Sequence, residues 1–582
     1  MVKLNVDWFQ AGGPEDIPDA HLSKCSIFQG LPKSLQNVCQ DNVHLMEYIH
    51  RVPVEELGIP EFYPELSRKL SELKKRNLIY PVAENVFTHI CPDPHGERDF
   101  YISVEPSTTL ELDALLIEVD SLLVDFADRF AEVENDEDRL RALMECLSII
   151  CGKSGGNGAK NNASKLGLLK RIRRNGNGGG ARLNVTDRQY EGLRYLIERN
   201  KIGVGPLQPM MLDSNIEDIS GSGLGHIFIE HKVFKSLKTG TYFETHEELD
   251  EFVLRLGERI KHPLTLRNPI ADATLPDGSR VNIVYGRDVS KRGTSFSIRK
   301  FADNPLSVME LIGFHALSYQ MAAYLSFVIE DGMNVFVCGE TASGKTTLVN
   351  AITTFIHPQA KIITIEDTPE LQIPHPNWLR EVTKFTDDGK GVGMFDLLKA
   401  ALRQRPDEIL IGEIRGAEGN IAFQAMMTGH AVMSTFHAAS VEKLIQRLVG
   451  EPINVPRNYI DNLNVVVIQQ QVKTPDGKKG RRATSISEII GFDPIAGAFN
   501  FVEVFKWNPV TDEFEFPGKF NSYLLEQKIA PKRGLPPDKA RQIYAMVDRR
   551  GKVLEKLHKD KKISEFYEVL QVLAKAQREG IF

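Results

Sequence analysis

The chain has 582 residues, of which 42% are hydrophobic and 26% are charged, and its formal net charge is −7. This length exceeds what one hydrophobic core usually organises, so several domains are expected. The composition is typical of globular proteins and excludes a fibrous or wholly disordered chain. Because the overall charge is acidic, the chain has no general attraction to nucleic acid, and no nucleic-acid partner is predicted.

No segment of the sequence predicts export or a membrane span. The N-terminus, from Met1 to Trp8, lacks the basic segment, apolar core and cleavage site of a secretory signal. The longest apolar stretch, 312–329, is broken by polar residues and is too short to cross a bilayer. The six cysteines include no CxxC pair, so neither a zinc site nor a disulfide framework is expected. We therefore expect a cytoplasmic protein.

Two features mark the N-terminal half. Between 110 and 130, leucines and phenylalanines recur at helical spacing among acidic residues, which predicts a long acidic amphipathic helix. From Gly152 to Arg182, glycine, asparagine and lysine replace this pattern, which predicts a flexible linker. The linker contains no acid, and it is either a solvated tether or a contact to anionic lipid headgroups. Its seven basic residues up to position 174 are Lys153, Lys160, Lys165, Lys170, Arg171, Arg173 and Arg174.

Beyond the linker, the sequence changes character along the chain. A turn-rich segment, 275–280, lies among short β-like runs and predicts a small α+β domain. From Asn334 onward, apolar strands alternate with helical segments, which predicts a mostly parallel sheet flanked by helices. The last stretch, from Leu524, is rich in Lys, Glu and Leu and predicts a helical appendage. The strands of the parallel sheet are expected at 335–338, 362–365, 409–411 and 432–435.

The strongest motif is GETASGKTT, 339–347, a complete GxxxxGK[ST] phosphate-binding loop between an apolar strand and a predicted helix. Glycines let the backbone curl, so that N–H groups and the helix N-terminus converge on phosphates. We expect Lys345 to bridge the β and γ phosphates of ATP and Thr346 to bind Mg²⁺. The predicted nucleotide-binding residues are Gly339, Glu340, Thr341, Ala342, Ser343, Gly344, Lys345, Thr346 and Thr347.

Hydrolysis also needs carboxylates that hold hydrated Mg²⁺ and activate the attacking water. Glu366 and Glu413 each end a predicted strand, at the edge where open α/β sheets bind ligands. Glu370 is a weaker candidate, because it serves equally well as a turn residue. His430 and His437 bracket the fourth strand, and one of them is a candidate for sensing the γ phosphate.

The ordered set GETASGKTT, ITIEDTPE, ILIGEIRG and TGHAVMSTFHA resembles the Walker A, aspartate-box, Walker B and histidine-box series of type II and type IV secretion ATPases. The resemblance implies that Glu366 activates water, that Glu413 supports Mg²⁺ and that His437 senses the γ phosphate. It also implies a homohexamer in which arginines of a neighbouring subunit complete the ATP site. The candidates are Arg280 and Arg299, with Arg267, Arg287 and Arg292 as rivals.

Segments outside these motifs look like the archaeal branch, and most closely like the archaellum motor ATPases. The resemblance implies ATP hydrolysis that powers assembly and rotation of a swimming filament. The implied partners are a polytopic membrane platform protein and accessory cytoplasmic archaellum proteins, at the inner face of the cell membrane. An archaeal pilus or type II secretion assembly ATPase is the alternative, and a nucleic-acid translocase or a non-hydrolysing switch is a weaker one. The segments are 77–82, 374–378, 487–493 and 523–530.

The expected fold class is α/β: a RecA-like P-loop NTPase domain follows a small α+β N-terminal ATPase domain and a helical N-terminal region. The helical or mixed region is expected at 1–150 and the glycine-rich basic linker at 151–182. The interface-forming N-terminal ATPase domain is expected at 183–303. The RecA-like catalytic domain is expected at 304–520 and the C-terminal helical appendage at 521–582.

Overall fold

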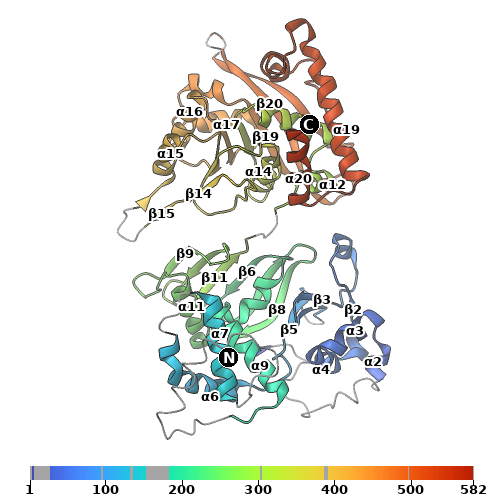
Figure 1. Cartoon of the computed structure of the whole chain (residues 1–582), viewed down its shortest axis with the longest axis vertical. Coiled ribbons are helices and arrows are strands. Elements are labelled where there is room, and N and C mark those ends of the chain that lie inside the picture. Colours follow the sequence, from blue (N-terminus) through green and yellow to red (C-terminus); the bar gives the residue numbers. More distant parts are fainter. Residues whose placement is uncertain are drawn as a thin grey trace, which may run out of the picture. The chain divides into compact units, whose positions relative to one another are not determined.

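A computed structural model describes the chain in two units, Met1–Ala302 and Asp303–Phe582. Figure 1 draws the first unit in blue to green and the second in yellow-green to red. Beyond Cys151, the predicted basic linker lies outside the described residues. The structure describes residues 3–4, 26–93, 96, 98–130, 135–151, 183–301, 305–385, 391–493, 495 and 497–580.

One large sheet forms the centre of the first unit. Among the described residues its strands are β1 (Lys3–Leu4), β2 (Glu61–Phe62), β3 (Leu78–Ala83), β4 (Val86–Cys91), β5 (Phe100–Val104), β6 (Ile216–Ser222), β7 (Gly225–His231), β8 (Lys235–Phe243), β9 (Ile270–Thr274), β10 (Arg280–Val284) and β11 (Ser295–Arg299). Their order is β2-β3-β4-β5-β8-β7-β6-β11-β10-β9, with β1 paired to β8. Strands β5 and β8 pair in parallel from either side of the linker. The predicted regions 1–150 and 183–303 therefore share one sheet.

Helices accompany this sheet. They are α2 (Ser26–Gly30), α3 (Lys33–Asp41), α4 (Val43–Arg51), α5 (Val54–Leu57), α6 (Asp113–Leu123), α7 (Asp136–Ile150), α9 (Asp187–Ile197), α10 (Gln208–Leu212) and α11 (His246–Arg259). Side-chain caps define some of their starts, because the first N–H groups of a helix need partners. Thr186 and Gln189 form a capping box at α9, and Thr245 accepts from the Glu248 N–H at α11.

The structure differs from the single long helix that the sequence predicts between 110 and 130. Helix α6 ends at Leu123, and the chain continues as a 3₁₀ helix over Val124–Arg129. Phe126 and Phe130 still pack against a cluster formed mainly by α6, α7 and α9. The difference arises because apolar spacing over so short a segment does not distinguish i+4 from i+3 hydrogen bonding, and 3₁₀ turns commonly finish α-helices.

The second unit is built on a sheet that is mostly parallel. Its nine strands among the described residues are β12 (Val335–Cys338), β13 (Ile362–Glu366), β14 (Trp378–Val382), β17 (Glu408–Glu413), β18 (Ala431–Phe436), β19 (Val465–Lys473), β20 (Lys479–Asp493), β21 (Ala498–Asn508) and β22 (Glu513–Glu515). Their order is β14-β13-β17-β18-β12-β19-β20-β21-β22. The strands up to β19 run parallel, and the last three are antiparallel. This confirms the predicted α/β, RecA-like class.

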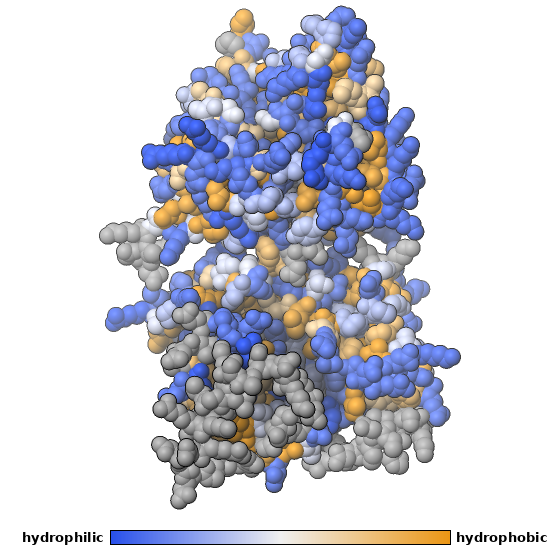
Figure 2. Space-filling model, in the orientation of Figure 1, coloured by the Kyte–Doolittle hydropathy of each residue, from blue (hydrophilic) through white to orange (hydrophobic). Residues whose placement is uncertain are grey.

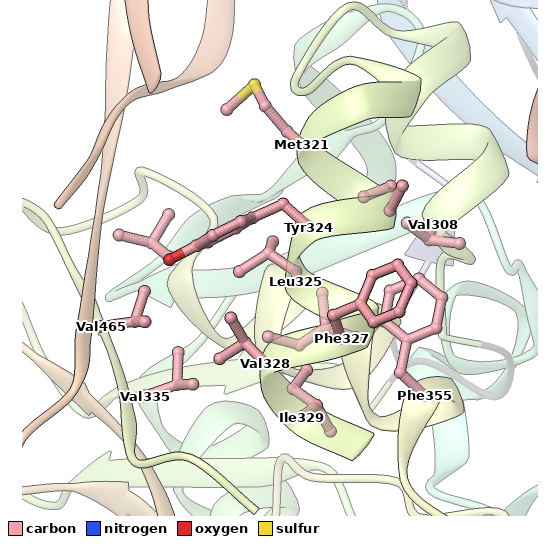
Figure 3. Packing of buried hydrophobic residues seen from close by; sticks show 14 of the residues in the cluster. Val308, Met321, Tyr324, Leu325, Phe327, Val328, Ile329, Val335, Phe355 and Val465 are labelled. Carbon is pink, nitrogen blue, oxygen red and sulfur yellow. The ribbon is translucent and has the colours of Figure 1, made fainter. Parts of the chain in front are cut away.

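Helices flank this sheet and close its core. They are α12 (Val308–Gly313), α13 (Tyr319–Glu330), α14 (Lys345–Ile352), α15 (Met394–Arg403), α16 (Glu418–Met427), α17 (Val441–Val449), α18 (Ala530–Lys532), α19 (Ile543–Lys559) and α20 (Phe566–Arg578). Every residue of α13 from Met321 to Ile329 is buried. Figure 3 shows Tyr324 and Val328 of this helix pointing toward Val335 and Val465. A separate short strand pair consists of β15 (Lys384–Phe385) and β16 (Gly391–Val392).

The predicted C-terminal appendage, 521–582, is anchored to α13. Arg550 of α19 is buried, and its guanidinium lies 3.8 Å from the centre of the Phe327 ring. It also lies 2.9 Å from a carboxylate oxygen of Glu330 and donates to the Ser326 hydroxyl at 2.9 Å. A buried cation is tolerated when it is paired in this way. The appendage therefore shares a core with the catalytic domain.

The surface of the described residues is mixed in character. On the face drawn in Figure 2, hydrophilic side chains predominate and hydrophobic ones are scattered among them. Large exposed hydrophobic residues such as Ile117 and Leu266 come from separate parts of the chain. None of the described helices combines the length and the apolar character that a membrane span requires.

Candidate active site

The phosphate-binding loop joins β12 to α14. Strand β12 pairs with β18 on one side and β19 on the other, and α14 begins at Lys345 after a left-handed Gly344. Position 339 requires glycine, because a Cβ there would lie 2.1 Å from the Gln469 carbonyl oxygen. A curled loop of this kind, followed by a helix N-terminus, is an anion-binding arrangement.

Lys345 is buried beside the loop. Its Nζ donates to the carbonyl oxygens of Gly339 and Glu340 at 3.1 and 3.0 Å. Burial lowers the pKa of Lys345, and the Glu413 carboxylate opposes this shift. The buried Ser343 hydroxyl has no hydrogen-bond partner among the described residues. A buried charge and an unpaired hydroxyl both cost free energy, so the loop is suited to an anionic ligand that pairs with them.

Glu366 ends β13, and its side chain is 1% exposed. Its Oε1 accepts from the N–H groups of Glu370 and Leu371 at 2.8 and 2.9 Å. Its Oε2 has no hydrogen-bond partner among the described residues and lies 4.0 Å from the Arg380 Nε. Burial raises the pKa of Glu366 to about 7, although the two backbone hydrogen bonds and Arg380 lower it. A fixed carboxylate with a pKa near neutrality suits a general base.

Glu413 and His437 meet at the ends of neighbouring strands. Glu413 ends β17, and His437 follows β18. The pairing of these strands shifts register between Ile411 and Glu413, and such bulges redirect side chains near active sites. His437 Nε2 lies 2.8 Å from Glu413 Oε1. Burial lowers the pKa of His437, against the opposing effect of Glu413. The structure therefore brings Lys345, Glu413 and His437 together.

Arg415 belongs to the same cluster, although the sequence did not single it out. Its Nη2 and Nε donate to Glu413 Oε2 at 2.5 and 3.0 Å. Its guanidinium also lies 4.0 Å from the Asp367 carboxylate, so it connects the ends of β17 and β13. The sequence signal that could have identified Arg415 is its position two residues after Glu413 in GEIRG. Residues i and i+2 of an extended segment lie on the same face, so Arg415 could be expected beside Glu413.

Two further candidates are placed differently. His430 precedes β18 and lies 3.1 Å from the Thr428 hydroxyl, at the opposite end of this strand from His437. Glu370 donates its backbone N–H to Glu366, and its negative charge raises the pKa of Lys345. Of the two histidines, the structure therefore brings only His437 to the phosphate-binding loop.

The candidate arginines belong to the first unit. Arg280 and Arg299 are direct partners across β10 and β11. Arg280 forms a bidentate ion pair with Asp272 at 2.6 and 3.0 Å. Arg299 pairs across the strands with Asp218. Burial raises the pKa of Asp218, and the charge of Arg299 lowers it. These acids offset the repulsion that two facing arginines create in an antiparallel sheet. The rival arginines are exposed and lie outside helices and strands: Arg267, Arg287 and Arg292.

The oxygen atoms at this site fit a nucleotide with Mg²⁺. The buried oxygens that lack a hydrogen bond among the described residues include three of these candidates: Ser343 Oγ, Glu366 Oε2 and Glu413 Oε1. Glu413 Oε1 is close to His437 but not aligned for a hydrogen bond. Carboxylate and hydroxyl oxygens are the ligands that Mg²⁺ prefers. Glu413 and the Thr346 hydroxyl, in the first turn of α14, are therefore the residues that would hold the ion.

Comparisons with known proteins find relatives over most of the chain. An uncharacterized protein of Methanocaldococcus jannaschii is 40% identical over 552 residues, which is 94% of this chain and 97% of that protein. Protein VirB11 of Agrobacterium fabrum is 28% identical over 274 residues, covering 41% of this chain and 77% of its own length. The solved structure of the ATPase DotB from Legionella pneumophila covers 62% of this chain and 93% of its own, at 19% identity and a TM-score of 0.37.

The matching family model is described as type II/IV secretion system protein and covers residues 201–501. This segment is more than half of the chain, and it contains Lys345, Glu366, Glu413 and His437. The chain belongs to the type II/IV secretion system ATPase family.

Proposed function

We propose that the chain hydrolyses ATP to ADP and phosphate. Lys345 pairs with the β and γ phosphates, and Glu366 accepts a proton from the attacking water. His437 contacts the γ phosphate and couples it to Glu413. Bound Mg²⁺, held by Thr346 and Glu413, would neutralise charge on the phosphates.

The observation that carries this proposal is the meeting of Lys345, Glu413 and His437 at the carboxyl edge of a parallel sheet. Glu366 ends another strand of the same parallel set, so its carboxylate belongs to the same edge. Its pKa of about 7 suits a base that works at neutral pH. Family membership adds that related chains serve secretion systems.

The direct test is phosphate release by the purified chain with ATP and Mg²⁺. Steady release that stops when a chelator removes Mg²⁺ is the expected result. Intact ATP after long incubation, with nucleotide bound, would instead favour a switch that signals without turnover. Stimulation only by added DNA would favour a translocase.

The rate of hydrolysis should depend on pH through Glu366. The base must be ionised, and burial raises its pKa to about 7. The rate should therefore rise as pH increases through about 7 and fall progressively below it. The measurement is kcat at saturating ATP between about pH 5.5 and 8.5, with circular dichroism to verify folding. A rate that stays constant down to about pH 5 would contradict the assignment of Glu366 as the base.

The ATP site is completed, in this proposal, by Arg280 or Arg299 of a neighbouring subunit in a homohexamer. The support is that both arginines face each other as direct partners on neighbouring strands of the first unit's sheet. The variants Arg280→Ala and Lys345→Ala should each be inactive alone. When they are mixed, rings contain some sites with both groups, so activity should reappear. Mixtures as inactive as the separate variants would exclude action of Arg280 across subunits, and Arg299→Ala is tested in the same way.

We further propose that hydrolysis powers assembly and rotation of an archaellum, with the ring on the cytoplasmic side of a polytopic platform protein. The support is the resemblance of four segments outside the ATP-site motifs and a relative in an archaeon that matches nearly the whole chain. Secretion or pilus assembly is the second candidate, favoured by the similarity to proteins named VirB11. Deleting the gene and scoring swimming and each type of surface filament separately distinguishes the two.

A further inference from the structure

The phosphate-binding loop is bordered on two sides, and only one side has a role in the proposed reaction. Strand β18, which leads to His437, flanks β12 on that side, and β19 flanks it on the other. From the β19 side, Arg481 of β20 reaches the loop, and its Nε donates to the Ala342 carbonyl oxygen at 3.1 Å. Its Cδ lies 3.3 Å from the position of a Cβ at Gly344. Arg481 therefore lies directly against the loop.

Gln469 of β19 borders the loop on the same side. It is 4% exposed, and its Oε1 has no hydrogen-bond partner among the described residues. Its Nε2 lies 3.9 Å from the position of a Cβ at Gly344. A buried amide oxygen normally finds a donor, so this unpaired oxygen points to a ligand that supplies one. The sugar and base of a nucleotide carry such donors.

The pairing of β19 with β20 is irregular beside the loop. Its register shifts between Ile468 and Gln469, and bulges of this kind redirect side chains next to active sites. The next residue along β20, Arg482, is buried and forms a bidentate ion pair with Asp512 at 2.7 and 2.8 Å. Arg482 therefore fixes the hairpin, and its neighbour Arg481 is held against the loop.

We propose that Arg481 is a nucleotide-binding residue of this chain's own site, a role that rests on the proposed ATPase function. Its Nε supports the loop through Ala342, and its two terminal nitrogens donate to phosphate oxygens. Within the described residues, the bond to Ala342 is the one hydrogen bond that the Arg481 side chain makes. Because Arg481 lies on the side of β12 away from Glu413 and His437, it binds phosphates that ATP and ADP share.

The test is nucleotide affinity of Arg481→Ala, measured with fluorescent ATP and ADP analogues, together with steady-state kinetics. A charge-assisted hydrogen bond is lost, so Kd for both nucleotides should rise about tenfold. KM should rise by a similar factor while kcat at saturation stays within about twofold, because the contact is equal in ground and transition states. Arg481→Lys should recover part of the affinity. Lys479→Ala removes the same charge two residues away and should have no effect.

Three results would overturn the proposal. They are unchanged Kd values in Arg481→Ala, weakened binding of ATP but not of ADP, or a loss of kcat at unchanged KM. Because Arg481 is exposed, the variant should melt at the same temperature as the wild-type protein without nucleotide. Failure of the ATPase proposal shows separately, since the wild-type chain would then bind neither nucleotide or leave ATP intact.

Discussion

The variant Lys345→Ala is expected to lose nucleotide binding and to lower ATP hydrolysis by about 10²–10³-fold in kcat/KM. The ammonium donates to the carbonyl oxygens of Gly339 and Glu340, and phosphate oxygens would replace them when nucleotide binds. Burial lowers the pKa of Lys345, so its charge is unfavourable until an anion pairs with it. The side chain therefore contributes to nucleotide binding and not to the stability of the nucleotide-free protein.

Thermal melting separates these two contributions. Without nucleotide, Lys345→Ala should melt at or slightly above the wild-type temperature. With ATP and Mg²⁺, the wild-type protein should shift upward and the variant should not, because ligand stabilisation requires binding. Lys443→Ala on α17 is the matched control, since it removes an exposed lysine of the same unit and should keep the shift. An equal ATP shift in Lys345→Ala would show that the loop does not bind phosphate through this residue.

The variant Glu366→Gln is expected to bind ATP normally and to lower kcat by about 10²–10⁴-fold. The amide oxygen can still accept from the N–H groups of Glu370 and Leu371, so the loop keeps its position. The neutral amide cannot take a proton from water. Because the buried carboxylate has a raised pKa, replacing it with an uncharged group should not destabilise the fold. Single-turnover phosphate release, with nucleotide affinity measured in parallel, tests both statements.

Glu370→Gln is the matched control for this variant. Glu370 is exposed and contacts Glu366 through its backbone N–H, which the substitution keeps. Its kcat should stay within a few-fold of wild type, with the pH dependence near pH 7 unchanged. The activity that remains in Glu366→Gln should no longer change with pH near 7. Wild-type rates in Glu366→Gln would falsify its role as the base and move the assignment to Glu413.

Much of the catalytic unit could be predicted from the sequence, because its signals are local. The four strands expected at 335–338, 362–365, 409–411 and 432–435 are present, each lengthened by at most two residues at an end. Buried parallel strands are continuous apolar runs, which a sequence displays directly. Parallel strands share a carboxyl edge, so residues at their ends, such as Glu366 and Glu413, could be assigned to one site.

The sequence by itself determined the phosphate-binding motif, the α/β class and the acidic residues at the strand ends, since each depends on neighbours in the chain. Only the tertiary structure decided which histidine faces the loop, because His430 and His437 differ in which end of β18 they occupy. The tertiary structure also decided that segments 61–104 and 216–299 share one sheet, and that Arg481 contacts Ala342. These depend on pairings between distant segments, and no local pattern specifies which segments pair.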